Sequence, residues 1–241
     1  MIVVGAGYTQ DTTLPHMAIR NAYADATFSD IAPRSMQTYS FWTGPGELEA
    51  DGAADIDYMA CYIRDHSGAT IQPEYLDGSI WTAFGDPVTP GKDGPILWVG
   101  PEVSALAVRL VVSGGAAKVG NFKAGLVDVI PVGIPLGYEP GYLNPQDVYT
   151  GNFSRRGQIL GTTLERTGVS ESLSFQDIEQ EWIEDNWLDI RNALRTEAAY
   201  FAWLPADLPD HLVYVAFEDG SASYSQGLYG QITLNMAGPS A

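Results

Sequence analysis

A stretch near the middle of the chain, residues 105–112, alternates large apolar side chains with other residues. Successive side chains of an extended strand point to opposite faces, so this period predicts a β-strand with one buried face. The side chains predicted for that face are Leu106, Val108, Leu110 and Val112. Gly114 and Gly115 then supply a tight reversal before a second apolar run, 119–126.

Further short apolar runs precede this stretch. Residues 55–63 predict a buried strand, residues 69–78 a second strand that ends in an Asp77–Gly78 turn, and residues 96–99 a third. Short strands at this spacing are typical of a β-sandwich or jelly roll. We therefore expect a β-sandwich domain over residues 1–130.

Prolines and glycines without periodicity fill residues 131–148, which predicts a linker or extended arm. Beyond it, the alternation of residues 163–167 predicts a largely exposed hairpin. The third region, residues 149–241, is predicted to be an α+β domain.

One amphipathic helix is predicted in that third region, over residues 177–196. Its apolar stripe repeats at intervals of four, three and four residues and contains Ile183, Trp187, Ile190 and Leu194. Asp177 is the expected N-cap, with Gln180 reaching back to it. The helix is expected to cover an antiparallel sheet made from residues 198–204, 211–219 and 228–236. The whole chain is therefore predicted to be mainly β.

Charge and composition exclude some functions. Thirty acidic residues against twelve Lys and Arg give a net charge of −18, which repels a phosphate backbone. No apolar run approaches the length of about 20 residues that spans a bilayer. We therefore expect no nucleic-acid partner and no membrane insertion. Cys61, the single cysteine, lies in an apolar run and is expected to be a buried structural thiol.

The sequence offers no catalytic constellation. His16, His66 and His211 are the only histidines, and their spacing matches neither a metal site nor a triad. Gly5 and Gly7 begin a dinucleotide-binding pattern, but Gln10 replaces its third glycine. We therefore predict no catalytic, cofactor-binding or metal-binding residue, and no enzyme activity.

One acidic run, residues 47–57, could hold calcium through oxygen ligands on a loop. Its carboxylates are Glu47, Glu49, Asp51, Asp55 and Asp57. The run lacks the ligand spacing of an EF-hand, so a solvated acidic loop is favoured over a calcium site.

Two sets of residues are candidates for binding. Tyr39, Trp42 and Trp81 could stack on a sugar ring if their side chains are exposed, and could equally belong to the core. Arg155 and Arg156 are adjacent bases in an acidic region. They are expected to pair with an acid of their own fold or of a neighbouring subunit, which makes them candidates for a subunit contact.

The order of several weak motifs resembles a family of tail proteins from tailed bacteriophages that begin with a discoidin-like, galactose-binding-type β-sandwich. The motifs in the first half are Gly68-Ala69-Thr70, Asp77-Gly78, Trp81, Arg109-Leu110, Gly114-Gly115 and Val119-Gly120. Those in the second half are Ser154, Gly157, Leu160-Gly161, the aromatic run 200–205 and the run 209–214.

This resemblance implies a structural component of a virion tail, located in the tail tip, the baseplate or an adaptor ring. Its partners would be other tail proteins and further copies of itself in a ring. The alternative is a carbohydrate-binding module that recognises a glycan on the host surface. A cell-wall hydrolase is a third, disfavoured hypothesis.

Overall fold

The computed structural model describes residues 16–21, 27–28, 41–132, 146–202, 212–224 and 228–239. These residues form a mainly β, antiparallel fold with one helix, α1 (Gln180–Thr196), as the sequence predicts. None of the described helical segments is long and apolar enough to cross a membrane.

The first part of the chain is a sandwich whose two layers share two long strands. One layer contains β6 (Ile80–Ala83), β5 (Thr70–Asp77), the second half of β7 (Gly94–Ser113), the first half of β4 (Gly46–Arg64) and β2 (Thr27–Phe28). The other contains the first half of β7, the second half of β4, β8 (Lys118–Val129), β1 (His16–Asn21) and β3 (Trp42–Thr43).

Both halves of β4 and β7 face one hydrophobic core, which the long strands reach by bending. Register shifts in their pairing fall between Asp51 and Ala54 and between Ile56 and Tyr58. An extra residue in one strand bends it and increases its twist, so these irregularities form the corners of the sandwich. Leu48 from the first half of β4 and Met59 from the second half are both fully buried in this core.

The irregularity between Asp51 and Ala54 explains why one residue predicted to be buried is exposed. Val108, Leu110 and Val112 are buried as expected, but Leu106 is 49% exposed. Gly52 and Ala53 are the extra residues opposite Leu106, because Asp51 pairs with Ala107 and Ala54 with Ala105. The alternation therefore changes phase, and Ala105 is buried in place of Leu106.

The Gly-rich turn after β7 does not join two paired strands. β7 ends beside the start of β4, where Val112 pairs with Gly46, and β8 begins beside the end of β4, where Lys118 pairs with Arg64. Residues 114–117 therefore carry the chain from one layer of the sandwich to the other. Gly114 has a φ of +78°, and a Cβ on Gly115 would lie 1.8 Å from the carbonyl oxygen of Ser67. The turn therefore packs so closely on the loop before β5 that it requires glycine.

The sheet continues from the sandwich into the second part of the chain. β1 pairs with β8 on one side and with β11 (Ala199–Ala202) on the other. From β11 the order runs through β12 (Leu212–Tyr224), β13 (Tyr229–Pro239), β10 (Ile159–Glu179) and β9 (Gln146–Phe153). The helix covers this sheet, as predicted, with its stripe of Ile183, Trp187, Ile190 and Leu194 buried against it.

The start of the helix differs from the prediction. Asp177 is not its N-cap, because β10 continues through a bulge at that point and pairs with β13 as far as Glu179. Asp177 has a φ of +59°, and the helix begins at Gln180 without a side-chain cap.

A small core joins the two parts. Tyr58 and Tyr62 of β4 pack with Tyr200 of β11 and Tyr214 of β12. The rings of Tyr200 and Tyr214 lie 4.8 Å apart between centroids, and those of Tyr62 and Tyr214 5.8 Å. The predicted domain limits at residues 130 and 149 stay predictions. Most of the predicted linker, residues 133–145, lies outside the described residues, and residues 146–148 begin β9.

Candidate functional site

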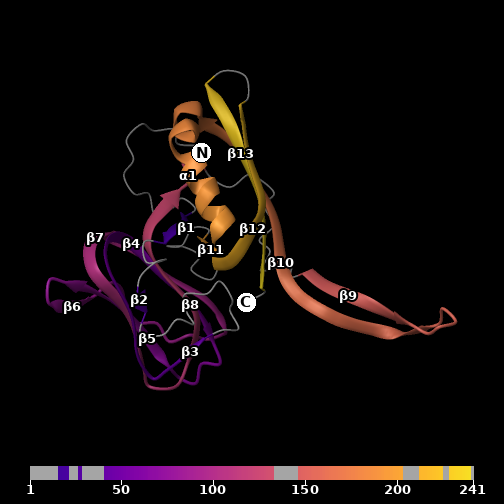
Figure 1. Ribbon diagram of the computed structural model, residues 1–241, viewed down its shortest axis with the longest axis horizontal. Helices are drawn as coiled ribbons and strands as arrows, with labels where there is room; N and C mark the ends of the chain where they lie inside the picture. Colours follow the sequence, from indigo (N-terminus) through magenta and orange to yellow (C-terminus); the bar gives the residue numbers. More distant parts are fainter. Residues whose placement is uncertain are drawn as a thin grey trace.

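The most prominent surface element is the hairpin that β9 forms with the first half of β10, here called the arm. It projects from the body of the molecule, and the second half of β10 continues into the sheet (Figure 1). Residues 159–168 of β10 pair with β9, whereas residues 168–179 pair with β13. Residues 163–167 therefore lie in one strand of a hairpin, as their alternation predicts, and Thr163 and Leu164 are exposed.

The turn at the end of the arm is closed by local hydrogen bonds. The backbone N–H of Ser154 donates to the carbonyl of Gln158 at 2.8 Å, and the N–H of Gly157 donates to that of Ser154 at 2.9 Å. The Ser154 hydroxyl oxygen accepts from the N–H groups of Arg156 and Gln158. Gly157 has a φ of +74°, which suits the residue that reverses the chain. This turn holds Arg155 and Arg156 at the tip, both exposed.

Large apolar side chains lie exposed along the arm. The exposed fractions are 75% for Ile159, 69% for Leu160, 57% for Tyr149 and 48% for Leu164. Tyr149 and Leu164 pair across the two strands, so their side chains are neighbours on one face of the hairpin. An isolated two-stranded hairpin is only marginally stable in water, and exposed apolar patches are typical of interaction sites. Arg155 and Arg156 form no ion pair with any residue that the structure describes. The arm is therefore a basic and apolar surface suited to docking.

A second cluster lies on the outer face of the β5–β6–β7 layer. The Arg109 guanidinium carbon lies 4.2 Å from the centroid of the Trp81 ring. The same guanidinium contacts the Glu74 carboxylate at 2.6 Å and the Glu47 carboxylate at 2.9 Å. Trp81 is partly exposed, so this cluster combines an aromatic surface with charged hydrogen-bonding groups.

The other two predicted sugar-stacking residues do not join this cluster. Trp42 lies in β3, which pairs with β8, and its partly buried side chain packs against the sandwich core. A Cβ on Gly44 would lie 2.6 Å from the Trp42 ring, which shows how closely the backbone covers it. Tyr39 lies outside the described residues.

The acidic run 47–57 is part of strand β4 and not a loop, so the predicted acidic loop is wrong. Its side chains spread along an extended strand: Glu47 pairs with Arg109, Asp55 accepts a hydrogen bond from Ser104, and Asp57 accepts one from the N–H of Val127. Burial, with the nearby Asp51 adding to it, raises the pKa of Glu49. Within the described ranges, no three His, Cys, Asp or Glu side chains gather in a metal-binding group.

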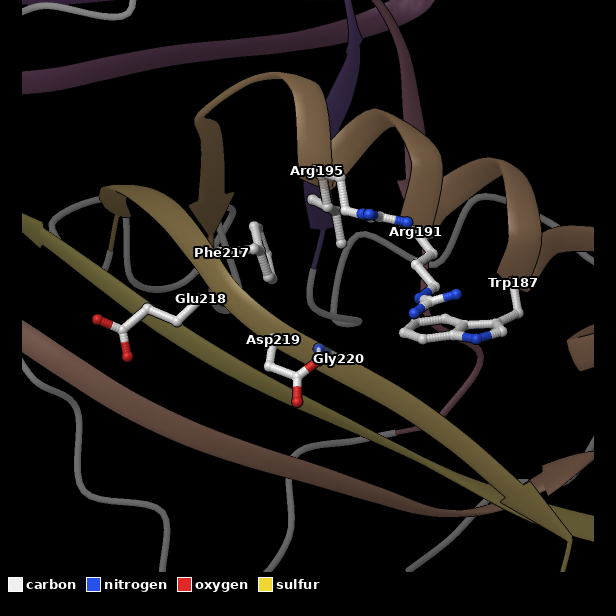
Figure 2. Close-up of a pocket in the computed structure, with 8 residues that line it drawn as sticks. Trp187, Arg191, Arg195, Phe217, Glu218, Asp219 and Gly220 are labelled. Atoms are coloured by element: carbon white, nitrogen blue, oxygen red, sulfur yellow. Dashed lines mark hydrogen bonds between the residues drawn. The ribbon is translucent and has the colours of Figure 1, made fainter.

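A shallow pocket of about 240 Å³, which the sequence did not indicate, opens between α1 and β12. Arg191 and Arg195 lie on the helix side of the pocket, and Glu218 and Asp219 on the strand side (Figure 2). Trp187, Leu194 and Phe217 supply its apolar lining. The lining contains two basic and two acidic side chains, so the pocket presents no single charge to a ligand.

An ion pair that the sequence did not indicate lies at the junction of the two parts. The Lys123 ammonium of β8 lies 2.6 Å from the Glu197 carboxylate and donates to the carbonyl of Ala198. The Lys123 side chain is 2% exposed, and burial lowers its pKa. Seventy-four residues separate the partners, so no local pattern could have indicated the pair.

Comparison with known proteins gives no family assignment, because no family model and no curated protein matches the chain. Among solved structures, the chain is similar to a chitosan-binding module of a Paenibacillus chitosanase/glucanase. The identity is 11%, the match covers 45% of this chain and 98% of that chain, and the TM-score is 0.36.

Two further similar structures are a Clostridium perfringens protein named CpGH89CBM32-6 and a Ruminococcus gnavus GH29 fucosidase in complex with fucose. The first is 16% identical over 41% of this chain and 90% of that chain, with a TM-score of 0.35. The second is 13% identical over 38% of this chain and only 21% of that chain, with a TM-score of 0.32. None of the three is named as a phage protein, so the predicted tail role stays a prediction.

Proposed function

We propose that this chain is a non-catalytic structural subunit of a multi-subunit assembly, and that the arm holds neighbouring subunits together. One observation carries the proposal: the arm projects from the body and exposes Tyr149, Ile159, Leu160 and Leu164. Burying an apolar side chain of this size stabilises a contact by about 1.5–3 kcal/mol. A neighbouring subunit that covers the arm would supply that burial.

The setting we propose is the tail of a bacteriophage virion, which is the assembly that the sequence resemblance implies. The arm supports a role in assembly of this kind, since shape-complementary interfaces are built around buried aromatic and apolar anchors. In this setting the sandwich and the helix-covered sheet form the body of a subunit, and the arm forms the contact between subunits.

Sedimentation velocity on the purified chain tests the proposal. We expect the full chain to sediment as an oligomer, and a variant with Ile159→Thr, Leu160→Thr and Leu164→Thr to sediment as a monomer. The control is Ile80→Thr, which removes a side chain of similar exposure, 69%, from the β5–β6 hairpin and should leave the oligomer intact. A full chain that stays monomeric over a wide range of concentration contradicts the proposal.

A second candidate function is glycan binding by the sandwich, and the Trp81–Arg109 cluster is the observation that favours it. Sugar rings stack on aromatic side chains, and their hydroxyl groups bond to charged donors and acceptors such as Arg109 and Glu47. The weak structural similarity to the chitosan-binding module named above does not contribute to this proposal.

A glycan array, followed by titration of each positive sugar, tests this second function. We expect Trp81→Ala to lose binding and Tyr149→Ala, which changes an exposed aromatic residue on the arm, to retain it. Absence of any glycan signal from the full chain, or equal binding by Trp81→Ala, would exclude a sugar site at this cluster.

A further inference from the structure

We propose that the tip of the arm docks on the start of helix α1 in a second copy of this chain. The inference rests on the proposed function, because it names the partner of the same arm. Two surfaces carry it. The tip consists of Arg155, Arg156, Ile159 and Leu160, and the helix-start patch consists of Glu181, Glu184, Leu188, Tyr224 and Leu228.

The helix-start patch is assembled from α1 and the neighbouring ends of β12 and β13. The N–H of Gln180 donates to the carbonyl of Leu228 at 2.8 Å, and the Tyr224 hydroxyl lies 3.5 Å from the Glu184 carboxylate. These contacts place the first turn of the helix beside the ends of the two strands. The patch therefore draws its residues from three segments that lie next to one another.

The patch exposes both apolar and acidic groups. The exposed fractions are 77% for Leu228, 63% for Leu188 and 57% for Tyr224. Glu181, Glu184, Asp185 and Asp189 are also exposed on the helix, and the first basic residue of α1 is Arg191. The patch thus presents negative charge around apolar side chains.

The tip has the complementary character. Its two arginines are exposed beside Ile159 and Leu160, and they form no ion pair with a described residue. The chain has only twelve Lys and Arg against thirty acidic residues, so two adjacent exposed basic residues stand out. Complementary charge steers association and fixes the register of a contact, while apolar groups at its centre supply affinity. The tip and the patch match in both respects.

The geometry requires two copies. The tip lies at one end of β10 and the patch at the other, because Ile159 begins this strand and Glu179, its last residue, leads into α1. At about 3.3 Å per residue, the strand is roughly 60 Å long, and Figure 1 shows the arm projecting away from the body that carries α1. A tip therefore cannot reach the patch of its own copy. Docking between copies joins two different surfaces head to tail, which produces a ring if the rotation closes and a filament if it does not.

Charge reversal tests the inference. One variant carries Arg155→Glu and Arg156→Glu, and a second carries Glu181→Lys and Glu184→Lys. We expect each variant alone to self-associate at least about tenfold more weakly than the full chain, because like charges then face each other. An equimolar mixture of the two should regain association, since each variant supplies a surface that complements the other.

The control variant, Glu102→Lys with Glu218→Lys, reverses two exposed acids elsewhere and should associate as the full chain does. Circular dichroism of each variant checks that the fold is intact. If reversing Glu181 and Glu184 has no effect while the arm variant with three threonines dissociates, the inference is overturned and the proposed function stands. If the full chain is monomeric, both fail.

Discussion

Asp57 is a partly buried carboxylate between β4 and β8. It accepts a hydrogen bond from the N–H of Val127 at 2.7 Å. Burial raises the pKa of Asp57 from 3.8 to about 6, and the negative charges of Glu102 and Asp128 add to the shift, while the hydrogen bond opposes it. The folded protein therefore favours the protonated form of this group more than the unfolded chain does.

The pH dependence of stability follows from this shift. Because the folded pKa is the higher one, ionised Asp57 opposes folding, and this cost grows as pH rises from about 4 to about 6. The variant Asp57→Asn keeps an oxygen acceptor for Val127 without the charge. We expect it to match the unchanged chain below about pH 4 and to be the more stable of the two above about pH 6.

Urea unfolding of both proteins across this pH range measures the effect. The difference in free energy of unfolding between variant and unchanged chain should increase with pH and then level off. A difference that is constant with pH would show that Asp57 titrates at the same pH in the folded and unfolded states.

β10 is one strand with two environments. Its second half contributes Leu173, which is 1% exposed, pairs with Leu234 of β13 and belongs to the core beneath α1. Its first half contributes Leu164, which is 48% exposed on the arm. The same residue type therefore serves the fold at one end of the strand and is left available for a partner at the other.

Matched substitutions in this strand separate the two roles. We expect Leu173→Ala to lower the free energy of unfolding by about 2–5 kcal/mol, because it leaves a cavity in the core. Leu164→Ala should change it by less than about 0.5 kcal/mol under conditions where the chain is monomeric. Chemical denaturation of both variants checks this. A large loss at Leu164 would mean that the arm packs on its own body.

The sequence pattern predicted correctly those features that depend only on neighbouring residues in the chain. The stripe of α1 follows from its own period, and burial of Ile183, Trp187, Ile190 and Leu194 confirms it. The predicted burial of Leu106 is wrong because its exposure depends on a bulge in β4, some fifty residues earlier in the chain. The predicted N-cap at Asp177 is wrong because pairing with β13 extends β10 as far as Glu179.

The candidate sites show the same division. Arg155 and Arg156 were singled out from the sequence because they are adjacent bases in an acidic region, and the structure places them at the tip of the arm. The helix-start patch was not predicted. It unites the start of α1 with residues about forty positions later, Tyr224 and Leu228, and only the folded sheet brings these together.

The sandwich and the helix-covered sheet are held together by contacts between residues that are distant in sequence. β1 pairs with both parts, and the tyrosine cluster and the Lys123–Glu197 pair bury further surface between them. The arm extends beyond this joined body (Figure 1). A well-anchored body with one projecting hairpin suits a subunit that reaches its neighbour.

Photo-cross-linking from the tip of the arm tests whether the arm of one copy contacts helix α1 of another. A benzophenone-bearing residue replaces Leu160 in the purified full chain, and Ile80 is replaced in the same way as a control. We expect a covalent dimer from position 160 alone, with the attachment mapped by mass spectrometry to residues 180–189 or 228–231 of the second copy. A product that stays monomeric, or a dimer yield equal to that from position 80, would contradict it.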